Sequence, residues 1–194
     1  MKYDIVLCGV GGQGILTIAN VIDRVALKEG LELKQAEVHG MAQRGGAVES
    51  HLRLSDQPIA SDLIPKGRAD MILAVEPMES LRYLAWLGDG GAVVASVTPF
   101  VNIPNYPDIK EVIAVIAKYE HHVLVDSKGL AKEAGNVRTE NTVMLGAASG
   151  YLPIDAGVLR NELAEMFLAK GQKLVDVNQR AFDLGRKLAL EAIG

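Results

Sequence analysis

Short apolar runs alternate along the chain with longer segments whose apolar residues recur at helical spacing. The short runs predict strands over residues 3–8, 31–38, 47–54, 71–75, 92–97 and 123–125. The longer segments predict helices over 15–28, 77–87, 109–119, 142–150, 156–170 and 175–193. A further helix starts after Asp126 or Ser127 and ends at Gly135, and Asp155 is typical of a helix cap. Alternating strands and helices are typical of one α/β domain with a largely parallel sheet.

The strand over 47–54 differs from the others because polar residues alternate with apolar ones along it. Glu49, His51 and Arg53 share one face, which predicts a solvent-exposed side of the sheet. This strand follows closely on the strand over 31–38, and a short connection favours antiparallel pairing. We therefore predict an antiparallel edge on the otherwise parallel sheet, within a single domain that spans residues 1–194.

Composition excludes several classes of protein. The chain is 49% hydrophobic and 23% charged, with a net charge of −4, so neither disorder nor nucleic-acid binding is expected. No apolar run approaches the length of a membrane-spanning helix, and we expect a cytoplasmic protein without membrane contact. The single cysteine, Cys8, predicts a small buried side chain and neither a disulfide nor an iron–sulfur or zinc site. No metal site is predicted.

A glycine-rich loop connects the first predicted strand to the first predicted helix. It contains the pattern G-x-G-x-x-G, which lets a phosphate approach a helix N-terminus. Its candidate binding residues are Gly9, Gly11, Gly12, Gln13 and Gly14. Glu37 lies 23 residues beyond Gly14, where a dinucleotide enzyme places its ribose-binding acid. The loop thus favours NAD binding and a ligand-free strand–helix turn about equally.

A second glycine-rich loop covers residues 39–46, with the sequence His-Gly-Met-Ala-Gln-Arg-Gly-Gly. Its candidate binding residues are Gln43, Arg44, Gly45 and Gly46. The planar guanidinium of Arg44 suits a phosphate or carboxylate, although one solvated arginine in a surface loop is an equal alternative. His39 is a candidate for acid–base catalysis because imidazole titrates near neutral pH.

Three stretches make the sequence similar to a known family. They are GVGGQGI at 9–15, EVHGMAQRGGAVESHLR at 37–53 and AVEPMESLRY at 74–83, with weaker matches from NTVMLGA at 141–147 onward. Together they resemble the γ-type chain of 2-oxoacid:ferredoxin oxidoreductases, most closely the indolepyruvate enzymes, and the resemblance covers nearly the whole chain.

The resemblance implies a three-layer, Rossmann-like domain that acts as one subunit of a larger enzyme. Such enzymes oxidatively decarboxylate a 2-oxoacid to an acyl-CoA and CO2 and pass the electrons to ferredoxin. It further implies that thiamine diphosphate, Mg2+ and the iron–sulfur clusters belong to a larger partner subunit, while coenzyme A is a substrate. This chain would then bind no cofactor alone and be inactive alone, and its two glycine loops would face coenzyme A or the partner.

Two further features and two other function classes remain open. Glu76 follows a buried strand and either contacts coenzyme A or the partner, or favours the N-terminus of the next helix. Gly88-Asp89-Gly90 has no asparagine at the spacing of a thiamine diphosphate motif, so we interpret it as a turn. The alternatives are a self-sufficient NAD(P)-dependent oxidoreductase and a non-catalytic nucleotide-binding interaction module.

Overall fold

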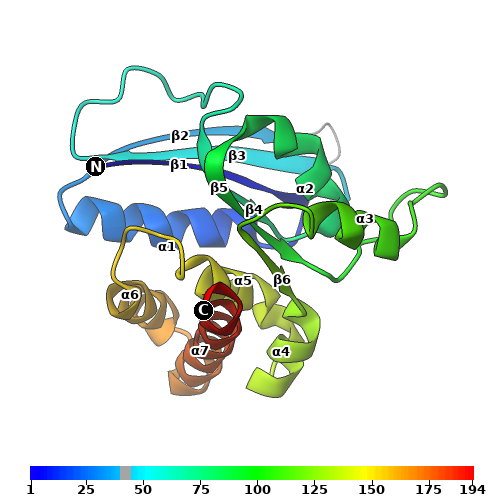
Figure 1. Ribbon diagram of the computed structural model, residues 1–194. Coiled ribbons are helices and arrows are strands. Elements are labelled where there is room, and N and C mark those ends of the chain that lie inside the picture. The colour runs from blue at the N-terminus through cyan, green and yellow to red at the C-terminus, as the bar shows by residue number, and fades with distance from the viewer. Residues whose placement is uncertain (40–44) are drawn as a thin grey trace.

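The computed structural model describes residues 1–39 and 45–194, which form an α/β domain around a six-stranded sheet of order β2-β3-β1-β4-β5-β6 (Figure 1). Strands β1, β4, β5 and β6 pair in parallel, whereas β3 runs antiparallel to both β1 and β2. The bounds are β1 (Lys2–Val10), β2 (Glu32–His39), β3 (Ala47–Ser55), β4 (Ala69–Ala74), β5 (Leu87–Ser96) and β6 (His122–Val125). The predicted fold class and antiparallel edge are confirmed.

Helices cover both faces of the sheet and make three layers (Figure 1). Alternation along β1 shows why both faces are apolar: Ile5 and Leu7 pack into one core, Val6 and Cys8 into the other. One face carries α1 (Ile15–Lys28), α4 (Ser127–Ala134), α5 (Glu140–Ala148), α6 (Ala156–Leu168) and α7 (Gln172–Ile193). The other face carries α2 (Pro77–Tyr83), a 3-10 turn (Leu84–Trp86) and α3 (Ile109–Ile116). Within the described residues, no helix is long and apolar enough to cross a bilayer.

Local capping sets several helix ends where the sequence predicted them. The side chain of Asp126 accepts a hydrogen bond from the backbone N–H of Gly129, and Asp155 does the same for Val158. These bonds satisfy amide groups that have no partner inside the helix. Gly135 ends α4 in the left-handed conformation, with φ 108°. The predictions at Asp126, Asp155 and Gly135 are confirmed.

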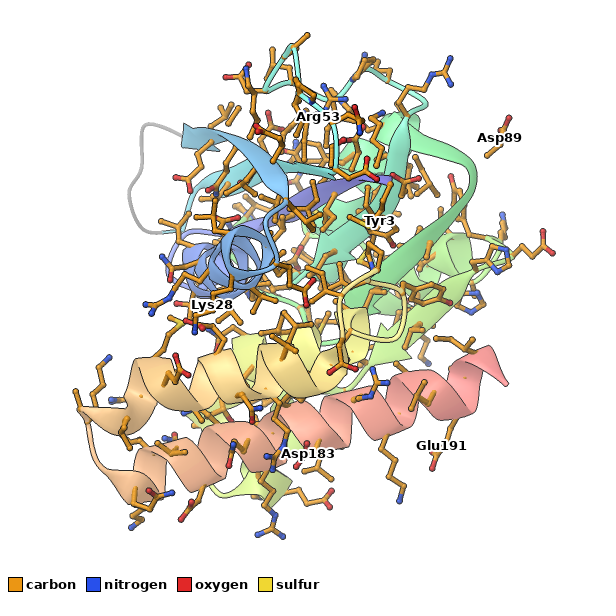
Figure 2. All side chains as sticks on the ribbon, turned by 90° about the vertical axis from the view of Figure 1, so that its left-hand side faces the viewer. Tyr3, Lys28, Arg53, Asp89, Asp183 and Glu191 are labelled. Atoms are coloured by element: carbon orange, nitrogen blue, oxygen red, sulfur yellow. The ribbon has the colours of Figure 1, made fainter. Side chains whose placement is uncertain are left out.

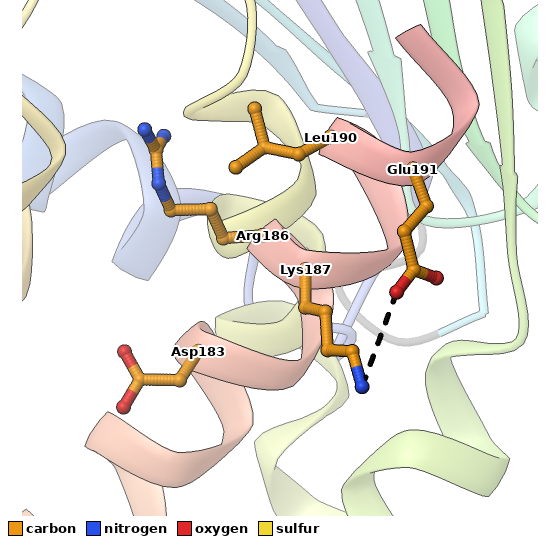
Figure 3. Close-up of a pocket in the computed structure, with 5 residues that line it drawn as sticks. All are labelled: Asp183, Arg186, Lys187, Leu190 and Glu191. Atoms are coloured by element: carbon orange, nitrogen blue, oxygen red, sulfur yellow. Dashed lines mark ion pairs between the residues drawn. The ribbon is translucent and has the colours of Figure 1, made fainter. Parts of the chain in front are cut away.

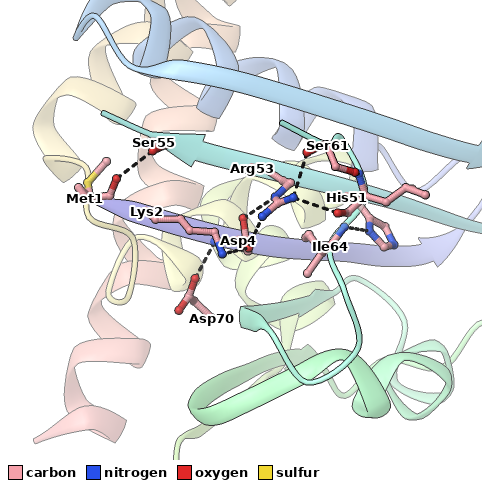
Figure 4. A network of polar contacts seen from close by, with 10 residues as sticks. Met1, Lys2, Asp4, His51, Arg53, Ser55, Ser61, Ile64 and Asp70 are labelled. Atoms are coloured by element: carbon pink, nitrogen blue, oxygen red, sulfur yellow. Dashed lines mark hydrogen bonds and ion pairs between the residues drawn. The ribbon is translucent and has the colours of Figure 1, made fainter. Parts of the chain in front are cut away.

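The predicted solvent-exposed face of β3 is wrong, because residues 56–68 fold back over it (Figure 4). The guanidinium of Arg53 forms an ion pair with buried Asp4, with Nε 2.9 Å from Oδ1, and donates to the carbonyl oxygens of Ser61 and Leu63. His51 is only 4% exposed, and its Nδ1 accepts a hydrogen bond from the backbone N–H of Ile64. Arg53 and His51 therefore hold the loop over residues 56–68 against β3 through hydrogen bonds.

The predicted turn at residues 88–90 is also wrong, since β5 begins at Leu87. Ala69 pairs with Leu87 and Met71 with Ala92, so Asp70 alone on β4 lies opposite residues 88–91 on β5. The extra residues form a bulge, and Asp89 projects from it into solvent (Figure 2). Consistently, the helix predicted to run to residue 87 ends at Tyr83 and continues as the 3-10 turn.

Two glycines allow α5 and α7 to pack with their backbones in close contact. A Cβ atom on Gly185 would lie 2.0 Å from the carbonyl oxygen of Val143, and one on Gly146 would lie 2.1 Å from that of Phe182. Backbone atoms cannot move aside as a flexible side chain can. The crossing of the two helices therefore requires residues without a Cβ. The packing of α5 depends on this crossing, because its residues 142–148 are all buried.

We predict that Gly185→Ala lowers the free energy of unfolding by about 1–3 kcal/mol, because the added methyl forces the two helices apart. The measurement is the denaturation midpoint in urea. Gly150→Ala is the matched control, since its Cβ would meet only the end of the Ile193 side chain, at 3.0 Å, and otherwise atoms at 3.5 Å or more. A Gly185→Ala midpoint equal to that of the control would contradict the close packing.

We also predict that the contribution of His51 to the free energy of unfolding falls as the pH falls from about 7 to 5. Burial lowers the pKa of His51, so below about pH 6.5 the unfolded chain binds a proton that the folded chain does not. His51→Asn keeps an acceptor for the Ile64 amide without titrating. The variant should show a flatter dependence of unfolding free energy on pH, by up to about 1.4 kcal/mol per pH unit. Equal slopes in the two proteins would refute this role of His51.

Candidate functional site

The two glycine loops lie side by side at one end of the sheet. The N–H of Gly11 donates to the carbonyl of Gly46 at 2.8 Å, and the N–H of Gly45 donates to the carbonyl of Gly11 at 3.3 Å. These bonds extend the β1–β3 ladder beyond the pair Val10–Ala47. The predicted residues Gln43 and Arg44 and the side chain of His39 lie outside the described part of the chain, so their roles stay predictions.

A third segment, the connection over residues 98–107, lies against the second glycine loop. The side-chain amide of Asn102 donates to the carbonyl oxygen of Gly45 at 2.6 Å. The segment carries Phe100 and Val101, which are 42% and 68% exposed. Loops that are far apart in sequence thus form one surface at the carboxyl end of the sheet.

Gln13 closes the first glycine loop from within. Its Oε1 accepts a hydrogen bond from the N–H of Val10 at 2.8 Å, and its Nε2 donates to the carbonyl of Val75 at 3.3 Å. The backbone N–H of Gln13 donates in turn to the carbonyl of Val10 at 3.1 Å. The side chain therefore joins the end of β1 to the end of β4, and amides that would bind a pyrophosphate in a dinucleotide enzyme have partners inside the protein.

Different physical constraints require glycine at different positions of this loop. A Cβ on Gly9 would lie 2.3 Å from Cγ2 of Val75, so Gly9 is required for packing. Gly14 has φ 79°, and its Cβ would lie 2.6 Å from the side-chain nitrogen of Asn141. Gly12 has φ 103° and open space around it, so it is the most accessible of these three to a ligand or partner.

The position of Glu37 disfavours NAD binding. In a dinucleotide-binding fold the strand that ends in the ribose-binding acid lies next to the strand before the glycine loop. Here β3 separates β2 from β1, and adjacent strands are about 4.8 Å apart. Glu37 is therefore two strands away from the glycine loop. It cannot act there as the ribose-binding acid, which was the second feature that favoured a self-sufficient dehydrogenase.

Glu76 caps a helix. It is fully buried, and its Oε2 accepts a hydrogen bond from the N–H of Glu79 at 2.9 Å. Its Oε1 accepts from the N–H of Phe100 at 3.1 Å and from the hydroxyl of Tyr106. Both carboxylate oxygens are used inside the chain and none of the residue is exposed, which favours the second of the two expected roles, at the N-terminus of the next helix.

A cleft of about 620 Å³ opens beside the first glycine loop. Gly12 and Gln13 form one wall, and residues that the sequence reasoning did not select form the others: Thr98, Ser127, Lys128, Arg138, Glu140 and Asn141. Lys128 and Arg138 are exposed at its border. The only sequence signal was the position of 141–147 within the resemblance, because these residues meet the glycine loop only after folding.

A second hollow lies on the surface of α7 and carries no comparable chemistry (Figure 3). Its charged residues already have partners: Asp183 pairs with Arg160 at 2.8 Å, Arg186 donates to Ser149, and Lys187 lies 3.9 Å from Glu191. Across residues 1–39 and 45–194, no group of three or more His, Cys, Asp or Glu side chains could hold a metal ion. Cys8 is buried, as predicted, and burial raises the pKa of its thiol.

Comparison with known proteins identifies the family of this chain. Residues 4–188 match the family described as pyruvate ferredoxin/flavodoxin oxidoreductase. The chain is 39% identical to indolepyruvate oxidoreductase subunit IorB of Pyrococcus horikoshii, over 99% of this chain and 98% of that protein. It is 37% identical to the subunit of the same name from Thermococcus kodakarensis, over 100% and 98% of the two chains.

Solved structures show the same fold. The γ subunit of a keto/oxoacid ferredoxin oxidoreductase from Geobacter sulfurreducens superposes with a TM-score of 0.75 at 22% identity, covering 99% of this chain and 98% of that one. A 2-oxoglutarate:ferredoxin oxidoreductase from Magnetococcus marinus, solved with 2-oxoglutarate, coenzyme A and succinyl-CoA, superposes with a TM-score of 0.77 at 23% identity. The match covers 98% of this chain but only 31% of the Magnetococcus chain. The chain therefore belongs to the pyruvate ferredoxin/flavodoxin oxidoreductase family, as the motifs at 9–15 and 37–53 predicted.

Proposed function

We propose that this protein is the γ-type subunit of an indolepyruvate:ferredoxin oxidoreductase. The complex would convert an aryl pyruvate and coenzyme A to an acyl-CoA and CO2 and pass two electrons to ferredoxin, one at a time. The observation that carries the proposal is the 39% identity to an indolepyruvate oxidoreductase subunit over nearly the full length of both chains. Two features of the chain agree with a role as an accessory subunit. Its one thiol is buried, and its first glycine loop uses backbone amides in hydrogen bonds within the protein.

The proposed partner is a larger subunit that carries thiamine diphosphate, Mg2+ and the iron–sulfur clusters, and through which ferredoxin receives electrons. In the Magnetococcus enzyme the matching fold is 31% of one chain, so most of that chain consists of other parts. We place the complex in the cytoplasm, in keeping with a chain whose single cysteine cannot form an internal disulfide.

The surface proposed for the partner is the end of the sheet where the loops meet. Four apolar side chains in the elements at this end are exposed by 42–68%: Leu16, Phe100, Val101 and Val137. Apolar groups gathered around polar loops are typical of an interface. The second glycine loop, with Gln43 and Arg44, would contact either the partner or coenzyme A there, and His39 at its start remains a candidate for proton transfer.

The first test of this proposal is reconstitution. The chain alone should be colourless and inactive with any 2-oxoacid, because the redox and thiamine groups belong to its partner. Adding the large subunit should produce acyl-CoA with reduction of an electron acceptor, faster with indolepyruvate than with pyruvate. Turnover by the isolated chain, or a complex that prefers pyruvate, would refute the proposed division of labour or the substrate class, respectively.

The second test concerns Arg44. Loss of a guanidinium that grips a phosphate or a partner carboxylate should weaken binding at least tenfold, which is about 1.4 kcal/mol. Arg44→Ala should therefore raise the apparent dissociation constant for the large subunit or for coenzyme A, and Arg44→Lys should recover only part of the loss.

Titrating each component while the other is saturating identifies the contact that is lost. Arg180→Ala is the matched control, since Arg180 is exposed on α7. Wild-type curves in both titrations of Arg44→Ala would mean that Arg44 is a solvated surface charge.

A further inference from the structure

The outer edge of β2 is a strand edge that the proposed function does not use. β2 is the first strand in the sheet order, so one side of its backbone pairs with β3, and no described strand lies beside the other (Figure 1). We propose that this edge pairs antiparallel with the same edge of a second copy of the chain, about a two-fold axis at Leu33. The inference is independent of the proposed function, because it depends only on this strand and its neighbours.

The two edges of the sheet differ in how they resist pairing with another chain. Natural sheets protect an edge with a very short strand, a proline, a bulge or charged side chains. The edge strand β6 has 4 residues, so it offers little backbone for pairing. β2 has 8 residues, contains no proline and keeps an unbroken register with β3 from Glu32–Ser55 to His39–Val48. It is therefore long and regular enough to accept another strand.

The geometry of a two-fold strand pair permits only some registers. Side chains directly opposite each other in an antiparallel pair lie on the same face, and side chains alternate between faces along a strand. In a symmetric pair, residue i of one copy opposes residue j of the other, and j opposes i. The numbers of two opposed residues must therefore differ by an even amount, and one residue lies opposite its own copy at the axis.

Charge selects one of the permitted registers. Axes at residues 33–37 leave at least two residues of 31–39 on each side for pairing. An axis at Lys34 or Glu37 would place like charges directly opposite each other, which is unfavourable, and an axis at either residue between them places Lys34 opposite an uncharged side chain. With the axis at Leu33, Glu32 of each copy lies opposite Lys34 of the other. Symmetry then gives two ion pairs, one on each side of the axis.

Both members of this ion pair are available for it. Glu32 is exposed and Lys34 is half-buried. The Nζ of Lys34 lies 3.5 Å from the carbonyl oxygen of Ala60, and neither charged side chain has an ion-pair partner in the described part of the chain. A lysine on a strand edge opposes the addition of a second strand unless an acidic side chain lies opposite it. In the register centred on Leu33, that acidic side chain is Glu32 of the second copy.

Apolar side chains on the other face of the strand flank the proposed axis. Leu31 and Leu33 are half-buried and pack against the core on the α1 side. Leu27, in the last turn of α1, is 62% exposed. The turn into β2 is tight, with the N–H of Gly30 donating to the carbonyl of Leu27 at 3.1 Å, so Leu27 lies beside the start of the strand. Pairing at Leu33 brings the leucines of the two copies together and removes apolar area from water, which favours association.

Sedimentation velocity of the full chain tests this edge. We expect a species of twice the chain mass of 20.8 kDa that dissociates on dilution. Lys34→Glu and Glu32→Lys each place like charges opposite each other at both contacts, and each should weaken dimerisation at least tenfold. Mixed in equal amounts, the two variants should associate as strongly as the wild-type chain, because every acidic side chain then lies opposite a basic one. Lys173→Glu, an equal charge reversal at an exposed residue of α7, should leave dimerisation unchanged.

Several results would overturn the proposal. They are a wild-type chain that stays monomeric at every concentration, single variants that keep the wild-type denaturation midpoint and dimerise as strongly as the wild type, and a mixture of the two variants that stays monomeric. A monomeric wild-type chain whose affinity for the large subunit falls on Lys34→Glu would assign the edge to that subunit and overturn pairing between copies. Activity of the reconstituted complex reports on the proposed function separately, because Glu32 and Lys34 lie at the end of β2 away from the second glycine loop.

Discussion

The antiparallel ladder between β1 and β3 sets the positions of the two glycine loops at the candidate site. It begins at the pair Lys2–Ser55 and continues through Val10–Ala47 into the bonds between Gly11 and Gly45–Gly46. Because these last bonds are made by backbone groups of the two glycine loops, the loops hold each other in place. A β3 inserted beside β1 also moves β2 outward, which separates Glu37 from the first loop.

Because the loops bond to each other, the first glycine loop has fewer free amides for a phosphate than its sequence pattern suggested. A G-x-G-x-x-G loop binds phosphate when its amides are free to face the ligand. Here the Gly11 amide bonds to Gly46 and the Val10 amide bonds to Gln13, so the loop is a structural junction with one open residue, Gly12. Lys128 and Arg138, two cations that line the cleft, lie instead on α4 and in the 3-10 turn before α5, and neither has an ion-pair partner within residues 1–39 and 45–194.

Local rules were sufficient for much of the fold and insufficient for the site. The strand and helix over 3–28 and the caps at Asp126 and Asp155 depend on neighbouring residues, so periodicity and side-chain type predicted them. The buried polar face of β3 was missed because Arg53 finds its partners in Asp4 and the carbonyls of a distant loop. The cleft was missed for the same reason: its walls come from residues 12–13, 75, 98–100, 127–128, 137–138, 140–141 and 144.

Glu76 shows how a buried residue can order the surface that we propose for the partner. Burying a carboxylate is unfavourable unless hydrogen bonds compensate. One oxygen of Glu76 accepts a hydrogen bond from the backbone of α2, and the other accepts from Phe100 and Tyr106. Together with the bond from Asn102 to Gly45, this fixes both ends of a segment that holds two exposed apolar side chains. A surface loop that is already ordered loses little conformational entropy when a partner covers it. The buried carboxylate thus holds Phe100 in position on the surface that we propose for the partner.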